Sequence, residues 1–504
     1  MIRFFLLGLL SLLFLSPAQA AWHEASSDHF LIYSNQKEKD VKAFAERLER
    51  YHDTMRFLFN RPATKPSPSN RVTIYVVKNL GDVRDLYGGK NKYVGGFYIP
   101  RAGGSLAIVA KVKSSRYEMS QSELILLHEY AHHFLIGSAA RAYPRWLSEG
   151  FAEFYGTAKF GSDGSVSVGL SSKGRAYELA LARDVPIELL LDTKAYGEKK
   201  SKKYDSFYGQ SWALYHMLHF SQERKGQLSD YVSRLAQGAD EISAAKQAFG
   251  ALKELDKDLN SYLRKRKITT YRIPANYLNI GNIDVRRLRA GEAAMIPILI
   301  RSKRGVNEEQ AANLLVEARQ VAVQHPSDPA VLTALAEAEY DAGNDAEAIT
   351  AANQALAIDA NSINAYVQKG YALARMAPDA EDEAAAWKKM RRQFVKLNKI
   401  ENDHPIPLIQ FYRSYREQGI EPPTIAVDGL ARALELAPYD NGLRWMMANE
   451  FMEQKKYDWA AHTLGPLAHN PHQSEMTERA LALLKKAEAK ALEAKGQKET
   501  AVGS

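Results

Sequence analysis

The sequence of 504 residues contains no cysteine. Disulfide scaffolds, cysteine nucleophiles, iron–sulfur clusters and thiolate zinc sites are therefore excluded, and any bound metal must be held by His, Asp or Glu. A strong charge of one sign is also lacking, because 67 basic and 59 acidic side chains leave a net charge of +8. An excess this small and this widely spread does not indicate nucleic acid as a partner.

Long hydrophobic runs are absent beyond the first twenty residues, so we expect no membrane span in the mature chain. At the N-terminus, Arg3 precedes an apolar run over 4–15, and Ala18-Gln19-Ala20 fits a small-x-small cleavage site. The run has about 12 residues, whereas a membrane helix needs about 20. We predict a signal peptide over 1–20, with an uncleaved anchor as the alternative. The protein is then exported, to the periplasm or as a secreted protein.

The composition is that of globular protein, with 46% hydrophobic and 25% charged residues. At about 150 residues per domain, the length predicts two to four domains. Residues 21–115 alternate between strand and helix patterns. We expect a helix over 40–59 and strands over 30–33, 72–77, 95–99 and 106–109, the last two forming a hairpin.

Residues 116–270 have mostly helical patterns. Ser120 and Glu123 form a capping box before an apolar run that stops near Gly137, and Pro144 is placed to open a second helix. Further helices are expected over 207–220 and 251–266. Together, 21–270 are predicted to be one domain, a small mixed sheet followed by a helical part.

Two segments break the helical patterns. Residues 271–305 contain two prolines and short β-like pieces such as 295–300, and we interpret them as a connecting module. Residues 493–504 are predicted to be a flexible tail.

From about residue 306 the chain is alanine-rich and shows a repeat. Residues 330–362 place small and apolar side chains at the spacing of a helix pair, with Leu335-Ala336, Gly343-Asn344 and Ala355-Leu356 as markers. This spacing resembles the 34-residue tetratricopeptide (TPR) repeat. Partial copies follow to about residue 492, although 363–422 departs from the period. We expect an all-α repeat domain over 306–492 that binds a protein partner; a generic α-hairpin bundle is the alternative.

The chemistry is concentrated at His128-Glu129-Tyr130-Ala131-His132, an HExxH motif. Residues four apart lie on one face of a helix, so the two imidazoles can share one metal ion. Glu129 lies beside that metal, where its carboxylate can take a proton from a water molecule. Zinc needs a third protein ligand and one open position for catalysis.

A second segment, Trp146-Leu147-Ser148-Glu149-Gly150-Phe151-Ala152-Glu153, completes the pattern. HExxH followed by W-L-x-E-G-x-A-E resembles the gluzincin zinc metallopeptidases, in particular the peptidase MA-like group. The resemblance implies an α+β zincin-like fold, one zinc per chain, and Glu149 as the third ligand. It implies that Gly150 allows close helix packing, and that Glu153 orients a ligating histidine.

The resemblance also implies an oxyanion donor. Tyr208 lies in Tyr-Gly-Gln-Ser-Trp-Ala-Leu, which is similar to the tyrosine-containing helix start of the aminopeptidase branch, where a hydroxyl stabilises the oxyanion. That branch usually has Lys-Gly where this chain has Gln210-Ser211. A packed aromatic residue is the alternative for Tyr208, and Tyr204 is the reserve donor. His133, His216 and His219 are expected to be structural.

We therefore predict an exported zinc metallopeptidase that hydrolyses peptide or protein substrates, with TPR-like repeats for recruitment. The G-x-M-E-N-type loop with which aminopeptidases bind the substrate N-terminus is absent before the motif. Its absence favours an endopeptidase or an unusual substrate, with an aminopeptidase as the alternative. The resemblance to gluzincins also implies an edge strand along which a peptide substrate lies, which we expect at 95–99. The alternative is a weakly catalytic or non-catalytic periplasmic scaffold in which the repeats carry the function. An intact Glu129 favours the enzyme, because a structural metal site needs no base.

Overall fold

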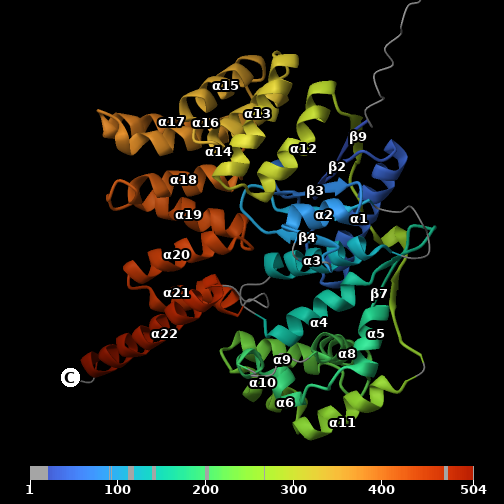
Figure 1. Cartoon of the computed structure of the whole chain (residues 1–504). Coiled ribbons are helices and arrows are strands. Elements are labelled where there is room, and N and C mark those ends of the chain that lie inside the picture. Colours follow the sequence, from blue (N-terminus) through green and yellow to red (C-terminus); the bar gives the residue numbers. More distant parts are fainter. Residues whose placement is uncertain are drawn as a thin grey trace, which may run out of the picture.

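The computed structural model describes residues 21–89, 91, 93–111, 119–138, 143–198, 204–265, 267–469 and 475–502. The predicted signal peptide over 1–20 lies outside these residues. Figure 1 shows a part that contains the β-sheets, coloured blue to green, and a stack of helices beside it, coloured yellow to red. Of the helices that the structure describes, none is long and apolar enough to cross a membrane.

The N-terminal part is built on a six-stranded mixed sheet with the order β4-β5-β3-β2-β1-β9. Three central strands, β2, β3 and β5, run parallel, β4 is antiparallel at one edge, and β1 and β9 are antiparallel at the other. The strands are β1 (His23–Ser26), β2 (Phe30–Ser34), β3 (Val72–Val77), β4 (Gly96–Ile99), β5 (Leu106–Ala110) and β9 (Asp284–Arg287). The predicted strands and the 95–109 hairpin are confirmed.

Helices cover both faces of this sheet. On one face, α1 (Glu38–Leu58) and α3 (Gln121–Ser138) share a buried core with β2 and β3. On the other face, α2 (Leu80–Tyr87) and α12 (Ala290–Arg304) pack on β3 and β5. The predicted capping box is present, since Ser120 Oγ accepts from the Glu123 amide and Glu123 Oε2 accepts from the Ser120 amide. The cap fixes where α3, the helix of the HExxH motif, begins.

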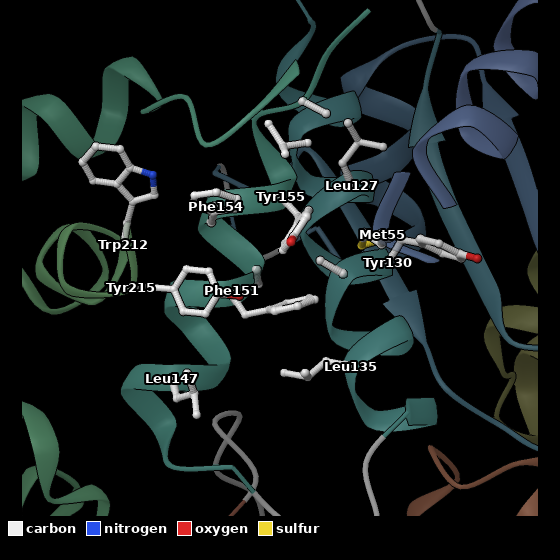
Figure 2. Packing of buried hydrophobic residues seen from close by; sticks show 14 of the residues in the cluster. Met55, Leu127, Tyr130, Leu135, Leu147, Phe151, Phe154, Tyr155, Trp212 and Tyr215 are labelled. Atoms are coloured by element: carbon white, nitrogen blue, oxygen red, sulfur yellow. The ribbon is translucent and has the colours of Figure 1, made fainter. Parts of the chain in front are cut away.

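Below α3 lies a helical region that opens with α4 (Arg145–Gly156), which starts directly after Pro144 as predicted. Figure 2 shows side chains of α4, among them Phe151, Phe154 and Tyr155, filling the space between α3 and α8 (Phe207–Phe220). The predicted helix over 207–220 is also confirmed, and the helix predicted over 251–266 extends over 252–263, with residue 266 outside the described residues. The other elements are β6 (Lys159–Phe160), β7 (Val166–Val168), α5 (Lys173–Leu181), α6 (Ile187–Leu191), α7 (Thr193–Gly197), α9 (Gln227–Ala236), α10 (Glu241–Phe249), α11 (Leu252–Leu263) and β8 (Tyr271–Ile273).

The segment 271–305 differs from the predicted connecting module. Its strand β8 pairs with β7 in a three-stranded sheet, and β9 pairs with β1 of the main sheet. The β-like piece predicted over 295–300 is wrong, because these residues lie in the middle of α12 with Pro297 inside the helix. Ile296 and Ile300 face the sheet while Met295 and Ile298 face α13, so burial on two sides explains the continuous apolar run.

The C-terminal part is an all-α repeat region in which each helix packs on the next along the chain. Small buried residues, such as Ala336, Ala352 and Ala355, lie where α14 and α15 cross closely. The last helix reaches Val502, so the flexible tail predicted over 493–504 is wrong as far as that residue. The helices are α13 (Glu308–Gln324), α14 (Pro329–Asp341), α15 (Asp345–Ile358), α16 (Ile363–Met376), α17 (Glu383–Ile400), α18 (Pro405–Arg416), α19 (Thr424–Leu436), α20 (Asn441–Glu453), α21 (Tyr457–Ala468) and α22 (Glu475–Val502).

The repeat region is joined to the sheet by specific contacts as well as by the chain. In the β4–β5 turn, the amide of Ala102 donates to Asp440 Oδ2 at 2.7 Å. Before β3, the amide and hydroxyl of Ser69 both donate to the carboxylate of Glu401, each at 2.9 Å. Ala102 is also buried in an apolar cluster formed by α18, α19 and α20. The repeats therefore hold the loops that precede β3 and β5.

Candidate metal centre

Two packed helices bring the predicted ligands together. His128 and His132 lie one turn apart on α3, and Glu149 lies on α4, directly across from both. These are the residues of the described chain whose donor atoms cluster as a metal site requires. The three side chains that the HExxH motif and the distant glutamate predicted as ligands therefore meet at one place in the structure.

The distances within this triad fit a tetrahedral zinc ion. The two imidazole Nε2 atoms are 3.2 Å apart, and Glu149 Oε2 lies 3.5 Å from His128 Nε2 and 3.4 Å from His132 Nε2. With zinc–ligand bonds of about 2.1 Å, adjacent ligands of a tetrahedron are separated by about 3.4 Å. The three atoms therefore occupy one face of such a tetrahedron, and the fourth corner is free of these three ligands.

The electrostatics of the triad also suit a cation. The side chain of Glu149 is 0% exposed, and neither of its carboxylate oxygens has a hydrogen-bond partner among the described residues. Burial alone lowers the pKa of His128, but Glu149, Glu153 and Glu129 outweigh it and raise that pKa to about 9. A buried carboxylate without a hydrogen bond is costly unless it is paired or bound to a metal. The residues present therefore fit a divalent ion.

Close helix packing holds this geometry. A Cβ atom on Gly150 would lie 2.5 Å from the carbonyl oxygen of Ser211 in α8, and one on Gly156 would lie 3.1 Å from the Cα of His128. Both glycines therefore allow α4 to approach its neighbours more closely than any side chain would permit. The prediction that Gly150 permits close packing near the site is confirmed.

The ligands are oriented by a second layer of polar groups. Glu153 Oε1 lies 3.4 Å from His128 Nδ1, where it can orient the imidazole as predicted. Two members of this layer were missed. Ser148 Oγ is 3.2 Å from His132 Nδ1, and Arg175 Nη2 donates to Glu153 Oε1 at 2.6 Å. Arg175 also forms an ion pair with Glu178 of the same helix at 2.6 Å, and Glu178 Oε1 accepts a hydrogen bond from the Gly209 amide of α8 at 2.8 Å.

Glu129 is the predicted base. It follows His128 on α3 and is partly exposed, unlike Glu149. Burial raises the pKa of Tyr98 on β4, and the negative charge of Glu129 adds to that rise.

Tyr208 lies at the start of α8, whereas Tyr204 precedes that helix. The ring of Tyr208 packs on the guanidinium of Arg175, whose central carbon is 4.7 Å from the ring centre. Burial raises the pKa of the Tyr208 hydroxyl, and the charge of Glu149 adds to that rise, so the hydroxyl keeps its proton. Tyr204 is 70% exposed and precedes the helix. Of the two tyrosines, Tyr208 is therefore the less exposed.

The other histidines have structural contacts, as predicted. His133 Nδ1 is 2.6 Å from the hydroxyl of Tyr98, and its ring lies 4.3 Å from that of Tyr439. His216 is fully buried, with Nδ1 at 2.7 Å from the Tyr262 hydroxyl and Nε2 at 2.9 Å from the Thr269 carbonyl oxygen. His219 stacks on the ring of Tyr215 within the same helix.

Comparison with known proteins finds likenesses in fold alone. No protein-family model and no curated protein matches the chain. Among solved structures it is similar to TTC0263, a thermophilic TPR protein of Thermus thermophilus, at 16% identity over 39% of this chain and 99% of that one, with a TM-score of 0.34. MamA of Desulfovibrio magneticus RS-1 is similar at 14% identity over 39% and 96%, with a TM-score of 0.28. Yeast Tom70 is similar at 12% identity over 62% and 65%, with a TM-score of 0.27.

Proposed function

We propose that this chain is an exported, zinc-dependent hydrolase that cleaves peptide bonds and holds one zinc ion per chain through His128, His132 and Glu149. The observation that carries the proposal is the spacing of the three donor atoms, between 3.2 and 3.5 Å, which equals that of three corners of a zinc tetrahedron. The export rests on the signal-like pattern over 1–20.

Each residue around the ion has a different role in hydrolysis. When bound, zinc polarises a carbonyl oxygen and makes water more acidic. Glu129 takes a proton from the attacking water and returns it to the leaving amine. Tyr208 donates a hydrogen bond to the oxyanion, which its protonated hydroxyl can do. Glu153, held by Arg175, keeps the His128 ring in orientation.

Peptide is the preferred substrate class for two reasons. The HExxH and W-L-x-E-G-x-A-E segments resemble those of gluzincin peptidases. In addition, β4 is the terminal strand of the main sheet and lies against α3, so its outer edge can pair with an extended peptide.

The proposal is tested by separating metal binding from turnover. The purified mature protein should contain about one zinc per chain by elemental analysis, and His128→Ala, His132→Ala and Glu149→Ala should each lose it. Glu254→Ala, on an exposed part of α11, is the matched control and should keep the metal. Full zinc retention in all three ligand variants would refute the site.

Glu129→Gln should keep both zinc and fold but lose hydrolysis, because it removes the base and leaves the ligands in place. The same inactive variant can capture the natural substrate in a pull-down from a periplasmic extract. Cleavage of a confirmed substrate by this variant at the wild-type rate would refute the mechanism.

A second candidate is an interaction scaffold in which the metal domain has little or no turnover. The extended stack of helix pairs from α13 to α22 favours it, since such repeats form extended surfaces that bind other proteins. Absence of cleavage across a peptide library by the zinc-loaded wild type, together with retained partner binding, would favour the scaffold.

A further inference from the structure

The repeat region contacts the turn that follows the edge strand β4. The amide of Ala102 in the β4–β5 turn donates to Asp440 Oδ2 at 2.7 Å, and the Ala102 side chain is buried in the apolar cluster of α18, α19 and α20. The next residue, Gly103, has a φ of +75°, and a Cβ atom there would lie 2.8 Å from the Ile406 side chain of α18. The turn therefore packs directly on the repeats, which fix the place where β4 ends.

The same part of the repeat region also contacts α3, the helix of the HExxH motif. The ring centre of Tyr439 lies 4.3 Å from that of His133, and Nδ1 of this histidine is 2.6 Å from the hydroxyl of Tyr98 on β4. Ile136, further along α3, packs against the apolar cluster of α18, α19 and α20. The repeats, α3 and β4 therefore meet at one place.

Two consecutive residues make the contacts with α3 and with the β4–β5 turn. Tyr439 and Asp440 lie in the short connection between the end of α19 and the start of α20. Figure 1 shows these two helices on the side of the sheet-containing part where β4 and α3 lie. The Tyr439 side chain is buried, so the connection is packed in place. One short segment of the repeat region thus holds both the zinc-site helix and the end of the edge strand.

We propose that Tyr439 and Asp440 are positioning residues that hold β4 relative to α3, so that the outer edge of β4 can pair with the backbone of a peptide substrate. This inference rests on the proposed peptidase function. Affinity in such pairing comes from main-chain hydrogen bonds, which weaken steeply when donor and acceptor are misaligned. The repeat region is then part of the substrate site and not a separate recruitment module.

Asp440→Asn tests the contact with the turn while the helix cap is kept. Asp440 uses Oδ1 to cap α20, accepting from the Leu443 amide at 2.9 Å, and Oδ2 to accept from Ala102. Asparagine keeps one oxygen for the cap, but its NH₂ group cannot accept the hydrogen bond from the Ala102 amide. Asp382→Asn is the matched control, because Asp382 caps α17 in the same way through the Ala385 amide.

Tyr439→Leu tests the contact with α3. It removes the ring that lies against His133, whereas Tyr439→Phe keeps that ring and should restore most of what Tyr439→Leu loses. Tyr457→Leu is the matched control, since Tyr457 begins α21 and its ring contacts Lys490 of α22.

Hydrogen–deuterium exchange measures how firmly β4 is held, without any turnover. In Asp440→Asn and in Tyr439→Leu, amides over 96–104 should exchange at least about tenfold faster, while those of β2 and β3 should be unchanged. Both controls should exchange like the wild type over 96–104. A local change of this kind differs from a general loss of stability, which would also accelerate exchange in β2 and β3. Wild-type exchange over 96–104 in both variants would overturn the inference.

Binding of an unfolded polypeptide measures the consequence for the substrate. Fluorescein-labelled casein should bind zinc-loaded Glu129→Gln protein in an anisotropy titration, and adding Asp440→Asn or Tyr439→Leu should weaken this binding about tenfold. In the active protein, the same substitutions should raise KM for casein by more than they lower kcat, because pairing with β4 already contributes in the ground state. Zinc content should stay at about one per chain, since no ligand is changed.

The outcomes distinguish this inference from the proposed function. If the zinc-loaded wild type binds and cleaves casein but both variants match their controls, the inference is wrong and the peptidase stands. If both variants loosen 96–104 and still bind casein with wild-type affinity, the inference is also wrong, because the position of β4 does not set the affinity. If the zinc-loaded wild type cleaves neither casein nor a peptide library, the peptidase is refuted, and the inference falls with it.

Discussion

Gly150→Ala is the substitution that best tests how the candidate centre is positioned. Gly150 follows the ligand Glu149 on α4 and lies at the crossing with α8, the helix that carries Tyr208. A methyl group there would lie 2.5 Å from the carbonyl oxygen of Ser211 and 2.9 Å from the Cβ of Tyr215. Ordinary contact begins at 3.4 Å, so the two helices must separate by up to about 0.9 Å.

The expected cost follows from two opposing contributions. Forcing extra atoms into a packed core costs about 1–3 kcal/mol, and a backbone clash at 2.5 Å belongs at the upper end. Alanine regains up to about 1 kcal/mol over glycine in a helix. We expect a net loss of about 2 kcal/mol in the free energy of unfolding. Because the separation moves Tyr208 away from Glu149, turnover should fall by up to about a hundredfold.

Chemical denaturation and steady-state kinetics measure the two effects. Gly137→Ala is the matched control, since this glycine also lies in a helix but a Cβ there meets nothing within 4 Å. The control should be unchanged or slightly more stable. If Gly150→Ala proved as stable as Gly137→Ala and retained full activity, the close approach of α4 and α8 would not position the site.

Three further predictions concern other parts of the chain. Tyr208→Phe should lower kcat about a hundredfold with little change in KM or thermal stability. Tyr204 is exposed in the structure, so Tyr204→Phe should have no effect on kcat. If Tyr208→Phe left kcat unchanged, another residue would be the oxyanion donor. Asp440→Ala should lower the free energy of unfolding by about 2–3 kcal/mol. The carboxylate of Asp440 is both the N-cap of α20 and the acceptor of the hydrogen bond from the Ala102 amide, and the substitution removes both. A denaturation curve identical to that of the wild type would contradict this prediction. Burial lowers the pKa of His216 to about 4, so below a pH of about 6.5 the unfolded chain binds a proton that the folded chain does not. Stability should therefore fall by about 1.4 kcal/mol per pH unit between about 6.5 and 4, and His216→Phe should flatten this slope in pH-dependent denaturation.

The parts of the fold that could be predicted from sequence were those with strong local periodicity. The stripe of α1 and the six-residue apolar strand β3 are examples, and each is buried where its pattern requires. The strands β1 and β9 were missed because they are four residues long, largely polar, and paired with each other from opposite ends of the sheet-containing part. The apolar run in α12 was misassigned because burial on both sides of a helix leaves no amphipathic period.

In the candidate site, too, the residues with a local sequence pattern could be predicted, and those positioned by tertiary packing could not. His128, His132 and Glu149 have a recognisable spacing in sequence, because two residues share one helix face and the third lies on the next helix. Arg175 had no such signal, since it reaches Glu153 from a separate helix and its position depends on tertiary packing. Ser148 lies inside the W-L-x-E-G segment, but at the position that the pattern leaves free.

The contact between Ala102 and Asp440 has a consequence for the order in which the chain folds. These residues are 338 positions apart, and Ala102 is buried by helices near the C-terminus. Until residue 440 has been synthesised, the β4–β5 turn is without its hydrogen-bond acceptor and its apolar cover. Contacts this distant in sequence form slowly, because a long loop must close before they contribute. The edge strand beside α3 therefore reaches its final form only after most of the chain is present, and any proteolytic activity that needs this strand develops last.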